Sequence, residues 1–241
     1  MARGRVHSWD LSIGVDGPGT RFVQFLAGCP LRCLYCHSPD TWRLRNGRLS
    51  SVDEVMSEVD GYTGFIRAAG GFTVSGGEPL LQPRFTAALL AAARDRGLHT
   101  ALDTSGYLGA RAGDDLLRVT DLVLLDVKSW HPGTYRRVTG VDVEPTLLFA
   151  RRLSRLGIPI WLRFVLVPGL TDDPSNVEGV ARFAAKLSTV ERVEVLPYHR
   201  LGVAKYAALG IRYPLEGTAP PDGALLARVR DQFAAEGLAV C

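Results

Sequence analysis

Six apolar segments with strand character are each followed by a segment of helical character along this chain. The predicted strands cover residues 21–27, 72–74, 99–102, 122–125, 160–167 and 192–196. Strands that alternate with helices build parallel sheets, because each helix carries the chain back to the start of the next strand. A full barrel has eight such units. Six units therefore predict an incomplete (β/α)6 TIM-like barrel, open on one side, with an open doubly wound sheet as the alternative.

Capping signals and helical periodicity place the connecting helices. Ser51 and Glu54 have the spacing of a capping box before a helical apolar pattern, and Gly70 and Gly71 end that helix. Further helices are predicted at residues 85–96, 114–119, 145–156, 175–187 and 223–236. No low-complexity linker or change of composition interrupts the pattern, so residues 1–241 are predicted to form a single domain.

Length, charge and hydropathy exclude several classes of protein. The chain has 241 residues, 46% of them hydrophobic, and can bury a core without disulfides. Its formal net charge is +3 and its basic residues are dispersed, which argues against a nucleic-acid partner. No segment has the length of a membrane span or the apolar core of a secretion signal. These features predict a cytoplasmic protein with reduced thiols and no membrane partner.

Three cysteines follow the first predicted strand with the spacing C-x3-C-x2-C. Cys29, Cys33 and Cys36 fall on one short loop, whereas Cys241 is the last residue and is expected to be a frayed thiol without a role. A [4Fe–4S] cluster normally takes four cysteines, so three leave one iron open to a small molecule. Zinc, with His37 or a distant residue as fourth ligand, is the alternative. The spacing favours the cluster, because structural zinc is usually held by two ligand pairs.

Polar residues and glycines gather where the predicted strands end. In a barrel, the loops that follow the strands build the active site. The candidate site residues at these ends are Gly76, Gly77, Glu78, Asp103, Thr104, Asp126, Val127, Lys128, Arg163 and His199. Each has an ordinary explanation when taken alone, such as a turn, a cap, a surface ion pair or a core histidine. Their position at successive strand ends predicts one mouth lined with ligands and charges.

Two charged groups in this set need partners. Arg163 lies on an otherwise apolar strand, and a buried guanidinium needs an anionic partner, for which a carboxylate-bearing ligand is one candidate. Asp126 and Lys128 are two residues apart and project to the same face of their strand. A strand-end lysine in an apolar barrel is also compatible with a Schiff-base aldolase, although that function leaves the cysteines unexplained.

These segments together resemble a known family. The cysteine loop, with Tyr35 before its last cysteine, is similar to the cluster motif of the radical S-adenosylmethionine (SAM) superfamily. Within this superfamily, seven segments resemble motifs of the activases of glycyl radical enzymes. They are VDGPGTRF at 15–22, YCH at 35–37, SGGEP at 75–79, LDTSG at 102–106, LDVK at 125–128, VPG at 167–169 and LPYH at 196–199. Only Cys241 is left over, as in single-cluster activases of the pyruvate formate-lyase type.

The resemblance implies a set of cofactor contacts. Cys29, Cys33 and Cys36 would be the catalytic metal ligands of a [4Fe–4S] cluster whose fourth iron binds the amino and carboxylate groups of SAM. Gly76, Gly77 and Glu78 would hold the methionine amino group. The sugar and carboxylate end of SAM would be surrounded by Asp103, Asp126 and Lys128. His199 would contact the ribose and the backbone of residues 35–37 the adenine, and the predicted cofactor-binding set also includes Tyr35, His37, Thr104, Val127 and Arg163.

The resemblance also implies a reaction and partners. Reductive cleavage of SAM would give a 5′-deoxyadenosyl radical that abstracts hydrogen from a glycine Cα of a glycyl radical enzyme, which the resemblance suggests is pyruvate formate-lyase. Another glycyl radical enzyme or a small-molecule substrate is the alternative within this chemistry, and a zinc-binding interaction module is the alternative outside it. The family precedent implies a flavodoxin or ferredoxin as electron donor and a monomer.

Two further expectations concern the predicted mouth. Asp103 and Asp126 would repel a bound carboxylate unless a positive charge offsets them, so a monovalent cation or the Lys128 ammonium is predicted between them. A protein segment as substrate requires an open groove, and residues 202–221 after His199 are predicted to form its wall or lid.

Overall fold

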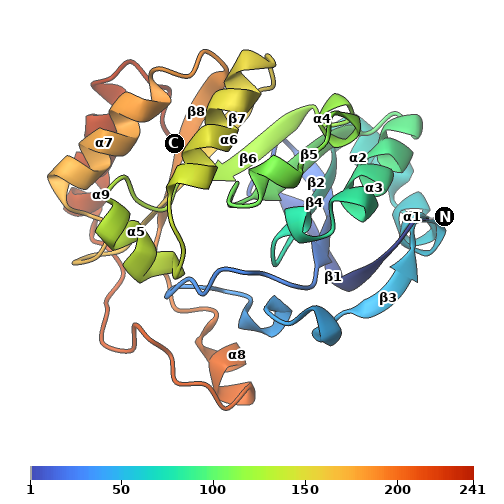
Figure 1. Cartoon of the computed structure of the whole chain (residues 1–241), viewed down its shortest axis with the longest axis horizontal. Helices are drawn as coiled ribbons and strands as arrows, with labels where there is room; N and C mark the ends of the chain where they lie inside the picture. Colours follow the sequence, from blue (N-terminus) through green and yellow to red (C-terminus); the bar gives the residue numbers. More distant parts are fainter. Residues whose placement is uncertain (1) are drawn as a thin grey trace. The chain divides into compact units, whose positions relative to one another are not determined.

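The structure is a computed structural model that describes residues 2–241. In this range, eight strands hydrogen-bond in the order β3-β1-β2-β4-β5-β6-β7-β8 (Figure 1). They are β1 (Arg3–Ile13), β2 (Thr20–Leu26), β3 (Arg48–Ser51), β4 (Gly70–Gly76), β5 (His99–Thr104), β6 (Leu122–Asp126), β7 (Ile160–Leu166) and β8 (Val190–Pro197). β2 pairs in parallel with β4, β4 with β5 and β7 with β8, whereas β1 is antiparallel to β2 and β3.

The six predicted strands correspond to β2, β4, β5, β6, β7 and β8. The prediction of an α/β fold with an incomplete (β/α)6 TIM-like barrel, open on one side, is therefore confirmed at the level of an open, mostly parallel sheet. The sequence pattern does not predict β1 and β3. β1 carries polar residues at most positions and buries only Gly4 and Val6, and β3 is four residues long, so neither has an apolar run that would mark a strand.

The helices agree with the predicted ones except in three places. Their bounds are α1 (Val52–Asp60), α2 (Thr63–Ala69), α3 (Pro83–Asp95), α4 (Asp114–Arg118), α5 (Pro132–Thr139), α6 (Glu144–Arg155), α7 (Pro174–Ala184), α8 (Val203–Ala208) and α9 (Gly223–Ala234), with short 3₁₀ helices at Pro39–Thr41, Leu44–Asn46, Pro79–Leu81 and Gly109–Arg111. The predicted capping box forms at α1, where Ser51 and Glu54 exchange hydrogen bonds. The prediction of one helix from 51 to 70 is wrong, because the helical run stops at Gly61 and restarts at Thr63, and α5 and α8 are not predicted.

The contacts divide the chain into two compact units, with boundaries inside the cysteine loop and inside β6. Unit 1 takes the chain up to Pro30 and from Thr41 to Leu124, and unit 2 takes Leu31–Asp40 and Leu125–Cys241. Cys29 belongs to unit 1, whereas Cys33 and Cys36 belong to unit 2. Each unit therefore carries its own share of the predicted site, and the expectation of a single domain stays a prediction.

The core of unit 1 lies between its strands and helices α1 and α3. Its buried side chains come from one face of β2 and β4 and from the facing sides of the helices: Phe22, Leu26, Phe72, Val74, Val55, Val59, Leu89, Leu90 and Ala93. Because side chains alternate across a strand, Arg21 and Thr73 point to the opposite face. The face opposite this core therefore carries buried polar groups such as Arg21 and Thr73 beside small apolar side chains such as Val23.

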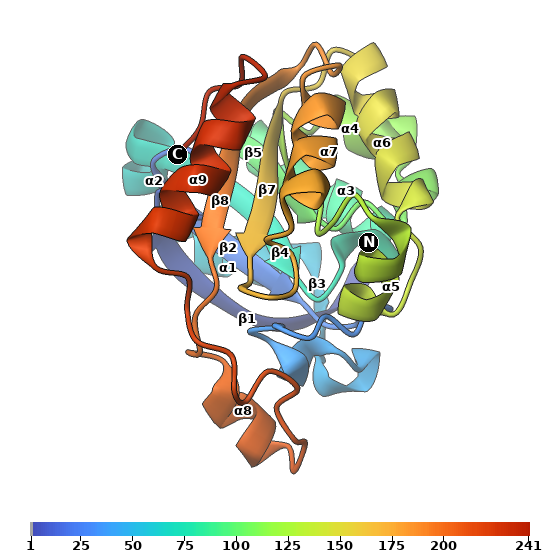
Figure 2. The same cartoon turned by 90° about the vertical axis from the view of Figure 1, so that its left-hand side faces the viewer.

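Unit 2 is built on β7 and β8, against which α7 and α9 lie side by side (Figure 2). Phe164 of β7 and Phe233 of α9 meet edge-on with ring centroids 5.6 Å apart. The chain then ends alongside β8, where the Cys241 amide donates to the Val193 carbonyl and the Cys241 carbonyl accepts from the Val195 amide (3.0 Å each). The expectation of a frayed terminus at Cys241 is therefore wrong. None of the helices between residues 2 and 241 has the length and hydropathy needed to cross a bilayer.

Candidate functional site

In unit 1, the start of the cysteine loop packs against the glycine pair that follows β4. The Gly77 amide donates to the Leu26 carbonyl (2.8 Å) and the Glu78 amide donates to the Gly28 carbonyl (2.9 Å). A Cβ on Gly77 would lie 2.3 Å from the Gly28 oxygen, closer than real contacts allow. Gly76 has a φ of +116°, in the region that favours glycine. These two glycines are therefore required for the close approach of the two loops, whatever ligand they also bind.

Glu78 is fully buried and holds the loops after β4 and β5 together. One carboxylate oxygen accepts from the Leu80 amide (3.0 Å) and the Thr104 hydroxyl (2.7 Å), and the other accepts from the Ser105 amide (3.0 Å) and hydroxyl (2.5 Å). Burial raises the pKa of Glu78, and the hydrogen bonds from Ser105, Thr104 and Leu80 oppose that rise. Both carboxylate oxygens are thus occupied by protein donors.

Asp103 and Thr104 lie at the end of β5, beside this carboxylate. The Ser75 hydroxyl donates to Asp103 at 2.6 Å, which ties the end of β4 to the end of β5. The Thr104 hydroxyl donates to Glu78 and accepts from the Gly106 amide at 3.0 Å. The structure therefore brings the unit 1 candidates Gly76, Gly77, Glu78, Asp103 and Thr104 together at neighbouring strand ends, as predicted.

The segment that resembles the activase signature at residues 15–22 is fixed by a buried arginine. The Arg21 guanidinium donates to the hydroxyl of Thr73 (2.6 Å) and to the carbonyls of Phe72 (2.7 Å) and His99 (2.9 Å). Thr73 in turn donates to the carbonyl of Asp16 (2.7 Å). Burial lowers the pKa of Arg21 to about 10, so the side chain stays charged at neutral pH. Arg21 thus anchors the β1–β2 turn to the sheet.

In unit 2, the rest of the cysteine loop rests on the end of α5. The Arg32 amide donates to the Thr139 carbonyl (2.8 Å) and the Leu34 amide to the Val138 carbonyl (2.9 Å). A turn then brings the Cys36 amide to the Cys33 carbonyl (3.1 Å). No disulfide joins any two of the four cysteines, Cys29, Cys33, Cys36 and Cys241.

Lys128 and Asp126 form an ion pair at the end of β6. The ammonium lies 2.8 Å from the carboxylate, and the lysine side chain is 9% exposed. Burial alone would lower the pKa of Lys128, but Asp126, with smaller contributions from Cys33 and Tyr35, raises it well above its usual value. A Schiff-base nucleophile needs a lowered pKa, so this ion pair argues against the aldolase alternative.

Cys33 and Tyr35 are close to the Lys128 ammonium in a desolvated part of unit 2. Burial raises the pKa of the Cys33 thiol to about 11, and Lys128 opposes the rise. The Tyr35 hydroxyl is buried without a hydrogen-bond partner, and its ring centroid lies 5.6 Å from the Lys128 ammonium. A bound metal stabilises thiolates and would overcome the cost of burying their charge. The cysteine thiols and the nearby Lys128 ammonium therefore fit an iron–sulfur cluster.

No group of three His, Cys, Asp or Glu side chains gathers around a single metal ion in the described part of the chain. A cubane cluster does not require such convergence, because each cysteine binds a different iron.

Arg163 finds its anionic partner within the protein. Its guanidinium lies 3.0 Å from Glu194 on the neighbouring strand β8, and both side chains are 7% exposed. Arg192 approaches the other oxygen of Glu194 at 2.5 Å and stacks on Trp161, 3.3 Å from its ring centroid. The buried charge of Arg163 therefore does not need a ligand carboxylate, and the role of Arg163 in cofactor binding stays a prediction. Its carbonyl accepts from the Val127 amide at 3.0 Å, which places Val127 beside β7.

His37, directly after Cys36 in the sequence, comes together with His199. Their rings stack with centroids 4.0 Å apart, and partial desolvation and the proximity of His199 lower the pKa of His37. A Cβ on Gly202 would lie 2.9 Å from the His37 Cα, so the start of α8 sits directly on this backbone. Lys205 of α8 pairs with Asp40 at 3.2 Å. The loop predicted as a wall thus contacts the cysteine loop within unit 2.

Sequence reasoning missed several residues that organise these loops. Ser75 and Ser105 supply hydroxyls to the site carboxylates, and Asn176 in α7 accepts three hydrogen bonds from the segment after Lys128. Ser75 and Ser105 lie within the segments SGGEP at 75–79 and LDTSG at 102–106. Asn176 stands in a helix with no motif around it, so no signal in one sequence points to it.

A family model and individual relatives give the same family for this chain. The family model for the radical SAM superfamily matches residues 23–183. The chain is 41% identical over 230 residues to pyruvate formate-lyase 1-activating enzyme of Escherichia coli K12, with 94% of each chain covered. It is 44% identical over 230 residues to the pyruvate formate-lyase-activating enzyme of Staphylococcus epidermidis, with 92% of each covered.

Solved structures agree at the level of the fold. A domain of a pyruvate-formate lyase-activating enzyme from Bacteroides vulgatus matches with a TM-score of 0.60 and 27% identity, covering 71% of this chain and 98% of that one. A radical SAM methyltransferase from Sphaerobacter thermophilus matches with a TM-score of 0.65 at 16% identity, covering 96% of this chain and 67% of that one. The second likeness shows the fold alone.

Proposed function

Because this chain belongs to the radical SAM superfamily, and within it to the pyruvate formate-lyase activating enzymes, we propose that it activates pyruvate formate-lyase by installing a glycyl radical. The observation that carries this proposal is the loop with the cysteine spacing C-x3-C-x2-C after β2, in a chain that matches those relatives over more than nine-tenths of its length. The family implies a [4Fe–4S] cluster and SAM as cofactors. Reductive cleavage of SAM, the chemistry these cofactors supply, yields a 5′-deoxyadenosyl radical that can take hydrogen from a glycine Cα.

In this proposal Cys29, Cys33 and Cys36 are the metal ligands and leave one iron for SAM. The Cys33 thiol is protonated at neutral pH in the metal-free chain, because its pKa is raised to about 11, so loading the cluster releases a proton there. Lys128 offsets part of the negative charge that the thiolates bring. The ring of Tyr35 is buried, with its centroid 5.6 Å from the Lys128 ammonium.

The strand ends after β4 and β5 are proposed to receive the amino end of SAM. Because both Glu78 oxygens already accept protein hydrogen bonds, Gly76, Gly77 and Glu78 would bind an ammonium through backbone carbonyls. The Glu78 side chain would then act by fixing the loop after β4, and Thr104 would act by donating a hydrogen bond to Glu78. Asp103 would lie beside the sugar of SAM.

The unit 2 candidates are proposed to hold the rest of SAM. Lys128 would bind the carboxylate of SAM, and Asp126 would keep the Lys128 ammonium in place through their ion pair. Val127, between them, would fix the end of β6 through its amide hydrogen bond to the Arg163 carbonyl. His199 would contact the ribose, while the backbone of residues 35–37 and the His37 ring would face the adenine. Arg163 would act through its carbonyl bond to Val127. We also propose a monovalent cation beside Asp103 and Asp126, although Lys128 already offsets Asp126.

The remaining proposals concern partners. A flavodoxin or ferredoxin would reduce the cluster, and the chain would act as a monomer in the cytoplasm, where thiols stay reduced. The segment from Gly202 onward, which rests on the Cys36–His37 backbone, would form a wall of the groove that admits the glycine segment of the lyase.

The test uses anaerobically reconstituted protein, dithionite, SAM and pyruvate formate-lyase grown with glycine that carries deuterium at Cα. The proposal predicts one deuterium in the 5′-deoxyadenosine formed, at a rate that depends on the lyase. Unlabelled 5′-deoxyadenosine with no dependence on the lyase would place this chain with radical SAM enzymes of another substrate. A failure to form 5′-deoxyadenosine would refute the assigned chemistry itself.

A further inference from the structure

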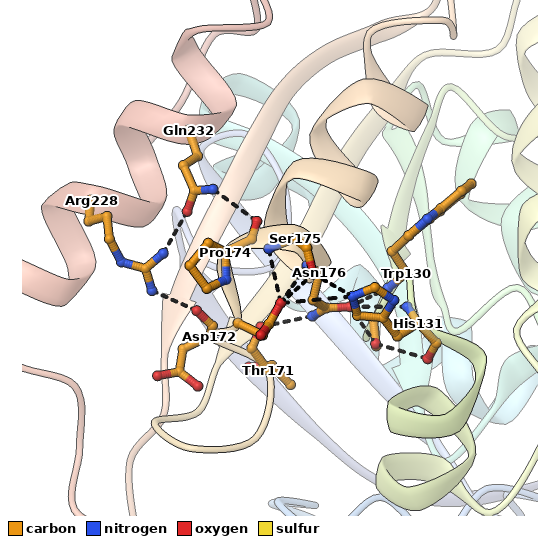
Figure 3. Close-up of polar contacts among 11 residues, drawn as sticks. Trp130, His131, Thr171, Asp172, Pro174, Ser175, Asn176, Arg228 and Gln232 are labelled. Carbon is orange, nitrogen blue, oxygen red and sulfur yellow. Dashed lines mark hydrogen bonds and ion pairs between the residues drawn. The ribbon is translucent and has the colours of Figure 1, made fainter.

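The segment after β6 is tied down on both sides of Lys128. Before it, the Val127 amide donates to the carbonyl of Arg163 at 3.0 Å. After it, one oxygen, Oδ1 of Asn176, accepts three hydrogen bonds (Figure 3), from the Ser129 hydroxyl (2.6 Å), the Trp130 amide (2.8 Å) and the His131 amide (3.1 Å). The position of Lys128 along the chain is therefore set by two anchors, of which one is a side chain.

Asn176 is itself held in one orientation. It lies in the first turn of α7 with 1% of its surface exposed. Its side-chain amide Nδ2 donates to the Thr171 carbonyl at 2.8 Å, in the loop that follows β7. The oxygen faces donors and the nitrogen faces an acceptor, so the hydrogen bonds fix which way the amide points. Asn176 thus joins the loop after β6 to the loop after β7.

A second set of contacts holds the loop after β7 from its other side (Figure 3). Arg228 of α9 donates to the Asp172 carbonyl (2.6 Å), and Gln232 donates to the Pro174 carbonyl (3.0 Å). Within the described residues, neither the Arg228 nor the Gln232 side chain hydrogen-bonds to residues 129–131. Arg228 is therefore a matched control, because its loss loosens the same loop without releasing the segment after Lys128.

We propose that Asn176 is a positioning residue that holds Lys128 in place for SAM, an inference that rests on the function proposed above. Ser129 and Lys128 are buried, and removing the Asn176 oxygen would leave the Trp130 and His131 amides without this acceptor, while the Ser129 hydroxyl would keep only the His131 carbonyl at 3.2 Å. The segment would shift to satisfy them and would carry the Lys128 ammonium with it. Small displacements of a binding group are enough to weaken the positioning of a cofactor.

The first readout needs no cofactor. In the metal-free protein, Asn176→Ala should speed hydrogen exchange at the Trp130 and His131 amides by about 10-fold or more, because their acceptor is gone. In the cluster-loaded protein, the SAM dissociation constant measured by anaerobic calorimetry should rise by about 10-fold, the scale seen when a group that orients a ligand-binding residue is removed. Asn176→Asp keeps the accepting oxygen but loses the donor to the Thr171 carbonyl, so it should weaken SAM binding less than Asn176→Ala does. Arg228→Ala should leave SAM affinity unchanged.

A double-mutant cycle with Lys128→Met tests whether the effect passes through Lys128. We expect Asn176→Ala to add no further loss of SAM affinity in that background, because the group it positions is already absent. Three results would overturn the inference. They are additive losses of SAM affinity in the double variant, an equal loss of SAM affinity in Arg228→Ala, and an unchanged SAM dissociation constant in Asn176→Ala. Ser129→Ala, which removes one donor, should shift SAM affinity in the same direction by less, and it decides the matter if Asn176→Ala does not fold. Wild-type protein that fails to bind SAM would refute the proposed function as well.

Discussion

At the residue scale, most charged and polar groups of the site are satisfied by partners that lie on other strands or loops. Arg163 pairs with Glu194, and Glu78 accepts from Thr104 and Ser105. The sequence singles out Arg163 and Glu78 because they are charged residues near the ends of apolar strands. It could not supply Glu194 as a partner, because that pairing depends on the register of β7 against β8.

Glu78 gives a prediction at this scale. Glu78→Gln replaces the oxygen that faces the Ser105 amide with an NH2 group, so it should cost about 1–3 kcal/mol in the free energy of unfolding at pH 7, measured with urea. Burial raises the pKa of Glu78, so the unfolded chain releases this proton at lower pH than the folded chain. As the pH rises from 4.5, the usual pKa of a glutamate, wild-type protein should therefore lose stability relative to Glu78→Gln. This loss should stop once the pH exceeds the raised pKa of the folded state.

Glu54 provides the control of opposite sign. It is exposed, and the hydrogen bond from the Ser51 amide lowers its pKa. The stability that Glu54 contributes relative to Glu54→Gln should be present above pH 4.5 and lost as the pH falls through the lowered pKa. Equal pH profiles for the two variants would contradict the burial argument for Glu78.

At the element scale, the sequence predicts the parallel strands well and the antiparallel ones not at all. β6 and β7 are near-continuous apolar runs, as buried parallel strands are, whereas β1 exposes polar side chains on a partly covered edge. Helix α8 falls in a segment predicted only as a wall, and α5 begins at a proline in a polar stretch with little apolar periodicity. Strand ends can be located from the sequence because polar residues interrupt apolar runs there. Contacts between loops, such as that of Gly77 with Gly28, cannot be predicted in this way, because they depend on how the strands are arranged in the fold.

The contact between Gly77 and the cysteine loop can be tested by adding one methyl group. In Gly77→Ala the new Cβ would press on the Gly28 carbonyl from 2.3 Å and should displace the start of the loop that carries Cys29. We expect a loss of about 1–3 kcal/mol in the free energy of unfolding and a lower iron and sulfide content per chain after reconstitution. Gly64→Ala, where a Cβ would meet nothing within 4 Å, is the control and should keep both. Normal iron content in Gly77→Ala would show that the two loops do not depend on each other.

At the scale of the whole molecule, the question is whether two compact units behave as one folding unit. The boundary between them passes through β6 and through the cysteine loop, so each unit is completed by chain segments that return from the other. This interleaving supports the expectation of a single domain. Trp9 and Trp42 report on unit 1, and Trp130 and Trp161 on unit 2.

Equilibrium unfolding of single-tryptophan variants in urea should therefore give coincident transitions for the two units, as two-state unfolding requires. Midpoints that differ between a variant that retains Trp9 and one that retains Trp161 would show two separately folding domains instead. Far-ultraviolet circular dichroism of the same samples provides the reference transition.

The central claim is that the three-cysteine loop and the SAM-binding strand ends serve to place a radical on a partner's glycine. The most direct measurement is an electron paramagnetic resonance spectrum of pyruvate formate-lyase mixed anaerobically with the reduced, cluster-loaded protein and SAM. The account predicts a glycyl radical signal that requires SAM and is absent with the Cys33→Ala variant. A protein that holds its cluster and cleaves SAM, yet leaves no radical on the lyase, would contradict it.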